Sequence, residues 1–305
     1  MEAIALACAA QVIYIISFVL FKTATARIQP MTGRHPFQVT RLLVTNPRWV
    51  AGCVLLTSGF ALSGMAMLDL PPATALPAYG ISLGLLLVVA RRGFDERPTS
   101  REWLAAFITI AAMIAIALSI GPEPEGAGAS YVVGGEPLWE IAVVVVPSLL
   151  IPLYMFSVRD RLDEGRHAIP LTGIAYGVGA GVLLGTAEVF GLGMARMLDE
   201  HRFDVHLSPY PYVFLIAGPL GLGLTSIGLQ RCRLSVLVTV VTLTAKVHLL
   251  LSASLLYGDP WPQDPALFGL RVAGVGLAVV ALMTFPRHER TMRVPHYRMR
   301  TPIMK

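Results

Sequence analysis

The chain has 305 residues, of which 55% are hydrophobic and 14% are charged, and its net charge is +5. Soluble domains carry roughly a quarter charged residues, so this composition argues against a water-soluble protein. It indicates a chain whose solvent is mostly lipid, in which long apolar segments form helices because hydrocarbon cannot satisfy their backbone polar groups. The alternating ten-residue strands of a membrane barrel do not occur in the sequence. We therefore predict an all-α integral membrane protein.

Nine apolar segments follow one another along the chain, and we predict that each is a transmembrane helix. They lie at about residues 3–21, 49–69, 72–91, 101–120, 137–157, 170–194, 208–229, 232–257 and 265–284. The first segment follows Glu2 and is itself followed by Lys22, whereas a signal peptide has its positive charge in front. We therefore expect the first segment to be a retained span.

Most of the 24 Lys and Arg residues lie in alternate loops and in the C-terminal tail, and the remaining loops hold only Arg196 and Arg202. Because cytoplasmic loops are enriched in Lys and Arg, this pattern predicts a plasma-membrane protein with its N-terminus outside and its C-terminus inside. The positive charge thus indicates topology, and we expect no nucleic-acid partner. The basic tail at 286–305 is predicted to lie against anionic lipids of the inner leaflet, or else only to fix the topology.

The predicted spans divide into two groups of four around one connector. Residues 1–120 form the first predicted repeat, and 121–169 hold an outer loop, the connector helix and an inner loop. Residues 170–285 form the second predicted repeat, which the odd number of crossings turns upside down, and 286–305 form the tail. Inverted repeats are typical of secondary transporters, whose substrate site lies near the midplane between the halves. A chance alternation of apolar spans is the alternative.

Three runs in the first half carry a family resemblance: 46–52 (NPRWVAG), 71–77 (PPATALP) and 101–103 (REW), with Gly59 and Ala66 between them. They resemble the P-x-W-x-x-G, A-x-x-x-P and E-W run of the drug/metabolite transporter superfamily, most nearly its nine-span NIPA-like and EamA-like members. The second half departs from the family, because the membrane proline is missing from 234–238 (LSVLV). The resemblance implies a carrier that translocates a substrate, and it does not name the substrate.

Charged side chains within a span are costly and are therefore candidates for function, and three stand out: Glu188, Lys246 and Arg271. At 1.5 Å per residue, Glu188 and Lys246 lie about 24 and about 20 Å from the inner face, and Arg271 lies about 9 Å from the outer face. We hypothesise that Glu188 pairs with Lys246 or Arg271 across a central cavity, where substrate or a proton competes for the pair. The alternative is a structural ion pair, with Arg271 reaching the outer headgroups.

Polar residues near these charges are further candidates for cavity lining. Thr239 and Thr242 share a helical face with Lys246, either facing a wet cavity or bonding to their own backbone. Gln11 and Tyr14 are neighbours on the first span, and Tyr79 lies on the third. These residues complete the predicted substrate or coupling site.

Four glycines, Gly173, Gly177, Gly181 and Gly185, recur at intervals of four residues in one predicted span. This spacing predicts a flat stripe along one helix face, which permits a neighbouring helix to approach closely.

Motifs of membrane enzymes do not occur in the spans, which offer neither clustered aspartates nor H-E-x-x-H. The cysteines Cys8, Cys53 and Cys232 lack the spacing of metal ligands, so we expect no metal site, disulfide framework or cofactor. We predict a secondary transporter for a small organic metabolite, with anions among the candidates and proton coupling as an option. The rival predictions are a non-transporting scaffold or accessory subunit and, less favoured, a magnesium carrier, which would want several inward carboxylates. A homodimer is one arrangement that the sequence leaves open.

Overall fold

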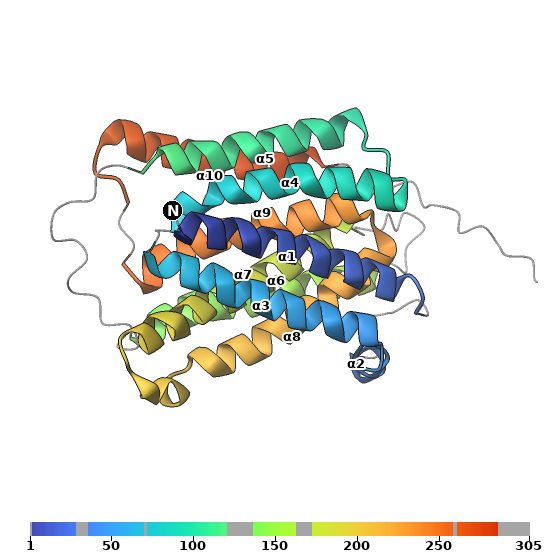
Figure 1. The fold of residues 1–305 in the computed structure, drawn as a ribbon, viewed down its shortest axis with the longest axis horizontal. Coiled ribbons are helices and arrows are strands. Elements are labelled where there is room, and N and C mark those ends of the chain that lie inside the picture. Colours follow the sequence, from blue (N-terminus) through green and yellow to red (C-terminus); the bar gives the residue numbers. More distant parts are fainter. Residues whose placement is uncertain are drawn as a thin grey trace, which may run out of the picture.

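The computed structural model describes residues 2–28, 36–69, 72–120, 137–162, 173–258 and 261–285. Within these ranges the regular elements are all helices (Figure 1). They are α1 (Glu2–Thr25), α2 (Pro36–Val44), α3 (Pro47–Asp69), α4 (Pro72–Phe94), α5 (Ser100–Leu118), α6 (Leu138–Leu162), α7 (Gly173–Asp199), the 3₁₀-helix η1 (Phe203–Leu207), α8 (Tyr210–Arg231), α9 (Leu234–Leu256) and α10 (Pro265–Thr284). This confirms the predicted helical class. The predicted outer loop at 121–136 and the basic tail at 286–305 lie outside the described residues.

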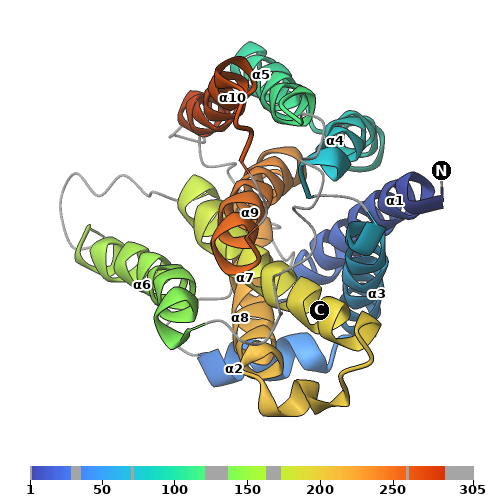
Figure 2. The ribbon, with the colours of Figure 1, turned by 90° about the vertical axis from the view of Figure 1, so that its left-hand side faces the viewer.

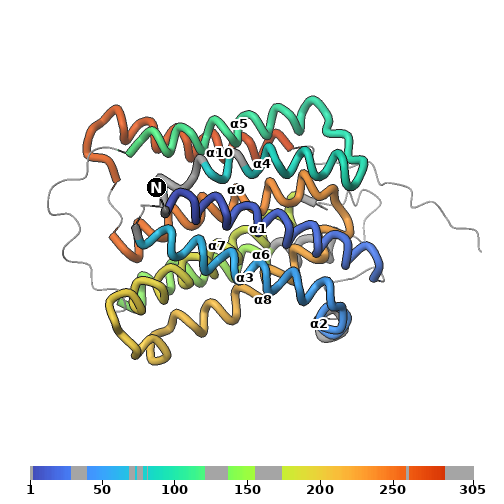
Figure 3. Tube along the Cα trace, in the orientation of Figure 1, coloured from blue at the N-terminus to red at the C-terminus, as the bar shows by residue number. Residues whose placement is uncertain are grey.

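The long helices lie side by side along one axis, and consecutive long helices run in opposite directions (Figures 1 and 3). They contain 19 to 27 residues, so each is about 28 to 40 Å long, enough for the roughly 30 Å of hydrocarbon in a bilayer. Among the described residues, seven helices are both long and apolar enough to cross a membrane: α1, α3, α5, α7, α8, α9 and α10. The other two predicted spans correspond to α4 and α6, which have 23 and 25 residues.

Helix α2 was not predicted from the sequence. It has only nine residues and lies across the axis of the long helices (Figures 1 and 2). A hydropathy window of span length averages such a short segment with its polar neighbours, which is why the sequence pattern missed it.

Proline and capping residues set where several helices begin. Four of them, α2, α3, α4 and α10, start on a proline, whose fixed φ suits the first helical position. Asp264 caps α10 by accepting from the backbone N–H groups of the second and third helical residues. Thr99 and Glu102 form a reciprocal capping box at the start of α5. These local signals fix the residues at which these helices begin.

Helices α7 and α9 form the centre of the bundle, as the view along its axis shows (Figure 2). Most of their residues are buried, whereas most residues of α10 are not. Helix α7 packs against α8 and α9, α1 packs against α3, and α5 packs against α10. A charged side chain on the inner face of α7 or α9 is therefore far from lipid and from water.

The contact of α7 with α9 depends on glycine. A Cβ atom on Gly181 would lie 2.7 Å from the carbonyl oxygen of Val241, and one on Gly185 would lie 2.7 Å from that of Ala245. Gly177 faces α9 in the same way, and Gly173 is the first residue of α7. The two backbones thus approach more closely than any larger residue would allow.

Candidate functional site

Glu188 and Lys246 meet at the centre of the bundle. The Nζ of Lys246, on α9, donates to Oε1 of Glu188, on α7. The side chains are only 4% and 6% exposed, respectively. Of the two pairings that the sequence left open for Glu188, the structure shows the one with Lys246.

Helices of the first half cover this ion pair. The hydroxyl of Ser63, on α3, donates to Oε1 of Glu188 at 3.3 Å and lies 3.4 Å from the hydroxyl of Tyr79, on α4. The Nζ of Lys246 lies 4.1 Å from the ring centre of Tyr79 and 5.7 Å from that of Tyr14, on α1. Both rings are within the range at which an aromatic face attracts a cation. We call these five residues the central cluster.

Gly59 makes room for Tyr14. A Cβ atom on Gly59 would lie 2.6 Å from Cε1 and 2.8 Å from Cδ1 of the Tyr14 ring. The ring therefore rests directly on the backbone of α3. Neither Gly59 nor Ser63 was assigned a role from the sequence. Their spacing of four residues, which puts both on one face of α3, is the signal that could have found them.

Two buried polar atoms of α1 have no hydrogen-bond partner among the described residues: Nε2 of Gln11 and the hydroxyl of Tyr14, whose ring lies beside Lys246. Both side chains are buried, and they lie three residues apart on one face of α1. Ala7, one turn before Gln11, packs with Ala66 and Ala78, which are close in sequence to Ser63 and Tyr79. Unpartnered buried polar atoms cost about 1–3 kcal/mol each, so they mark a place where a polar ligand or water would be favourable.

The predicted threonine face of α9 contributes less than expected. The hydroxyl of Thr239 donates to the carbonyl oxygen of Ser235 at 2.7 Å, which is the backbone bonding that the sequence left open. Thr239 lies about 10 Å along the helix axis from Lys246. Thr242 is partly buried on the same helix. The hydroxyl of Thr244 has no partner among the described residues, but this side chain packs against Gly181.

Arg271 lies at a different contact, that between α5 and α10. Its Nε donates to the hydroxyl of Ser119 at 3.0 Å, and its guanidinium lies 5.7 Å from the ring centre of Trp261. The side chain is 6% exposed, and these two contacts lie at the end of α5 and in the segment before α10 rather than at Glu188. The physical reason is packing, because α10 lies against α5 while α7 and α9 occupy the centre.

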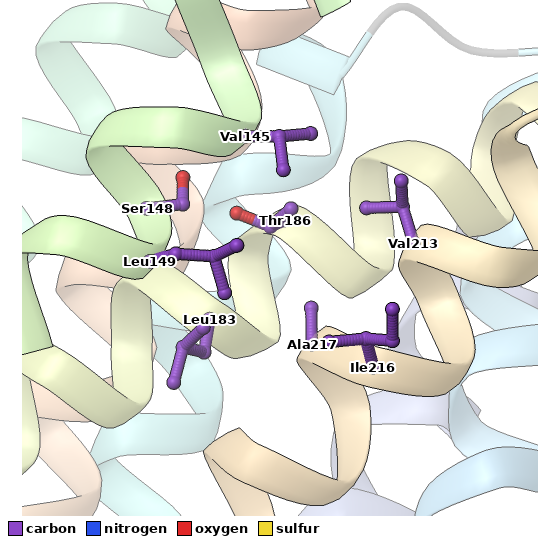
Figure 4. Close-up of a pocket in the computed structure, with 8 residues that line it drawn as sticks. All are labelled: Val145, Ser148, Leu149, Leu183, Thr186, Val213, Ile216 and Ala217. Carbon is purple, nitrogen blue, oxygen red and sulfur yellow. The ribbon is translucent and has the colours of Figure 1, made fainter. Parts of the chain in front are cut away.

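A separate pocket lies between α6, α7 and α8 (Figure 4). Its two polar side chains are Ser148 and Thr186, which donate to carbonyl oxygens of their own helices and lie 3.2 and 3.0 Å from Nε2 of His248. The remaining lining is aliphatic. Without a charged group in its lining, this pocket is a weaker candidate for recognition than the central cluster.

The two halves also hold each other at one end of the bundle. We call the end where α1 begins the N-terminal end, and the end where α1 finishes the far end. At the far end, Lys22 donates to two carbonyl oxygens at the end of α8, at 2.6 and 2.7 Å. In return, Gln230 of α8 donates to the carbonyl oxygens of Thr25 and Ile28, at the end of α1 and just after it. Each side chain satisfies carbonyl groups that a helix end leaves free.

A second set of contacts at the far end holds the turn between α8 and α9. The carboxylate of Glu96 accepts from the backbone N–H groups of Leu234 and Ser235, at 2.6 and 3.0 Å, and from the Ser235 hydroxyl. Arg233 donates to both carboxylate oxygens of Glu102 at 3.2 Å. A carboxylate at a helix N-terminus is favoured by the helix dipole. We call Lys22, Glu96, Glu102, Gln230 and Arg233 together the far-end clamp.

The site thus offers one carboxylate, one ammonium and several neutral polar groups. Among the described residues, no group of three or more His, Cys, Asp and Glu side chains is placed to hold a metal ion. No family model matches the sequence, and neither a curated protein nor a solved structure matches it. The geometry of the site itself indicates its chemistry, which is the exchange of partners in a buried ion pair.

Proposed function

We propose that this chain is a secondary transporter of the drug/metabolite type, which moves a small organic metabolite across the cytoplasmic membrane by alternating access. The observation that carries the proposal is the buried Glu188–Lys246 pair, enclosed between helices of both halves. The Tyr14 ring lies beside it, and α1 carries two unpartnered polar atoms, on Tyr14 and on Gln11 three residues earlier. A transporter binds its substrate at such a midplane site between repeats.

The proposed topology has nine spans, with the N-terminus outside and the C-terminus inside. The lengths of α4 and α6 support the count, and the alternating direction of the long helices supports the topology (Figure 3). The proposed second half, α7 to α10, inverts the first half, α1 and α3 to α5. In support, α7 packs on α8 as α1 packs on α3, while α3 touches α7 as α8 touches α1. Helices α4 and α5 each touch their own counterpart, as a two-fold axis in the membrane plane requires.

The ion pair is a poor device for stability alone. Removing two charges from water costs energy that their attraction repays only with good geometry and further hydrogen bonds. In a carrier, a metabolite or a proton can take one partner and release the other, which ties the pair to transport. A proton on Glu188 would free Lys246 for an anionic group.

Alternating access requires that one end be closed while the other can open. The far-end clamp closes one end of the bundle. Toward the N-terminal end, small buried side chains line α1, α3 and α4 beyond the cluster: Ala3, Ala7, Ala66, Ala73 and Ala78. Small side chains leave little to displace, so we propose that the cluster opens first toward the N-terminal end.

The rival proposal is a non-transporting subunit, and the closed packing around the ion pair is the observation in its favour. In that case Glu188 and Lys246 only lock α7 to α9. A magnesium carrier is less well supported, because Glu188 is the one carboxylate within the central cluster and Mg²⁺ prefers several oxygen ligands.

Accessibility of Ser63 separates these proposals. We would place a cysteine there (Ser63→Cys) in a variant whose three natural cysteines are replaced, and apply a membrane-impermeant thiol reagent to intact cells and to inverted membrane vesicles. A carrier exposes the site to each side in turn, so both preparations should be labelled. Thr109→Cys, at a fully buried position of α5, is the control that should stay unlabelled. If the reagent labels Ser63→Cys in neither preparation, the transport proposal is rejected.

A further inference from the structure

We infer that the central cluster receives a small zwitterion, a molecule that carries one ammonium and one carboxylate group. The inference rests on the proposed transport function and narrows its substrate. It starts from what the cluster already holds. The Lys246 ammonium contacts the Glu188 carboxylate and faces the rings of Tyr79 and Tyr14. A carboxylate beside two aromatic faces is how proteins bind organic ammonium groups, and a ligand ammonium can take the same contacts.

Charge balance then selects among ligands. The pair of Glu188 and Lys246 is neutral as a whole and buried. Unless a proton accompanies it, a ligand with a single charge would leave one of the two residues charged and without a counter-ion in a dry core, which is strongly unfavourable. A zwitterion that inserts between them gives each charge a new partner, its ammonium with Glu188 and its carboxylate with Lys246. No proton has to be taken up or released.

The unpartnered polar atoms fit the carboxylate of such a ligand. Nε2 of Gln11 is a donor, and the Tyr14 hydroxyl can donate. Both belong to one face of α1, and the Tyr14 ring faces the Lys246 ammonium at 5.7 Å. Carboxylate oxygens accept several hydrogen bonds at once, so Lys246, Gln11 and Tyr14 can all serve the same group. A cation alone would leave these donors unused.

The surroundings restrict the ligand to a small one. Ser63 and the two tyrosine rings of the cluster enclose the ion pair, and the Tyr14 ring is fixed against Gly59. Phe60 packs against the Tyr14 ring, and Ala7, Ala66 and Ala78 pack together on α1, α3 and α4. We therefore expect a molecule of about the size of alanine rather than a large amphiphile.

The test measures ligand-induced thermal stabilisation of the full-length protein in lipid nanodiscs. The zwitterionic probes are glycine, L-alanine, β-alanine and γ-aminobutyrate. Ethylamine and propionate are the matched probes that carry only one of the two charges of alanine. At least one zwitterion should raise the melting temperature, while ethylamine and propionate, alone or mixed, should not. The inference is overturned if no zwitterion raises it, or if ethylamine or propionate alone does so equally well.

Tyr14→Phe makes the test specific for the cluster. It keeps the ring and removes a hydroxyl without a partner among the described residues, so the unliganded protein should melt at the same temperature or higher. Binding of the zwitterion should weaken at least tenfold. Tyr154→Phe, on the exposed face of α6, is the control and should leave binding unchanged. Unchanged binding in Tyr14→Phe would contradict the inference. If Ser63→Cys is labelled from both sides while no zwitterion binds, the transport proposal survives and this inference alone fails.

Discussion

At the scale of single residues, the ion pair of Glu188 and Lys246 is the feature on which the proposed function depends. It lies on the deeply buried helices α7 and α9 and receives a further hydrogen bond from Ser63. Replacing only one of the two charged residues should therefore destabilise the protein, since the remaining charge would be left in the core without a partner.

A double-variant cycle tests this coupling. Lys246→Met alone should lower the free energy of unfolding by about 3–5 kcal/mol, because Glu188 is then buried unpaired. Combining it with Glu188→Gln should restore most of that loss. The measurement is thermal unfolding in detergent, with the exposed pair of Arg202 and Asp204 as the control, where the same changes should matter little. A double variant as unstable as the sum of the single ones would mean that the two residues are not coupled.

Gly59 provides the second test at this scale. Gly59→Ala should destabilise the protein by about 1–3 kcal/mol, because the new Cβ would overlap the Tyr14 ring. Gly64→Ala, one turn and a half along the same helix, is the matched control. Its Cβ would meet only the Cβ of Ala195, at an ordinary 3.8 Å, so its melting temperature should stay near that of the unchanged protein. Equal effects of the two substitutions would show that Tyr14 does not rest on α3 as described.

How much of the site the sequence predicts depends on the kind of residue. Glu188 and Lys246 stand out because a charge within an apolar segment is rare and costly. Gln11, Tyr14 and Tyr79 were predicted from their polarity and spacing. Ser63 and Gly59 were missed, since a small residue in an apolar run acquires its role only from the helix that packs against it. The pairing of Arg271 was likewise decided by helix packing, which hydropathy does not encode.

At the scale of elements, the helix ends at the far end make specific contacts, as the helix centres do at the central cluster. The sequence predicted the long helices to within a few residues, because length and hydropathy are local properties. It did not predict the far-end clamp. Lys22 and Arg233 lie near predicted span ends, where Lys and Arg were interpreted as topology signals, and Glu96 and Glu102 were given no role. Lys22 and Glu96 bond to backbone groups of the other half, and Arg233 bonds to the Glu102 carboxylate; only the fold brings these partners within reach.

Weakening the clamp should open the far end. Glu96→Gln removes the negative charge that caps α9, so labelling of Ser63→Cys from the far-end side should become faster, by an expected severalfold. Asp95→Asn is the matched control, because Asp95 is exposed, and Asn tolerates its positive φ of 49°. If both variants label at the rate of unchanged protein, the clamp does not govern access to the cluster.

At the scale of the whole molecule, transport by alternating access requires two states that differ in which end of the bundle is open. The present structure is closed around the central cluster and clamped at the far end. Two packings of one bundle can exchange when their free energies differ by only a few kcal/mol. The contacts of α1 with α8 and of α3 with α7 are those by which, in the proposed inverted repeat, the second state would mirror the first.

The most direct test of this claim is a pair of distances measured by double electron–electron resonance in nanodiscs. Spin labels at the exposed residues Arg27 and Met283 report on the far end, and labels at Ile4 and His201 report on the N-terminal end. Introducing Glu96→Gln should lengthen the far-end distance and shorten the N-terminal one in the same population. Distances that stay single and unchanged at both ends would contradict transport by alternating access and favour the structural ion pair.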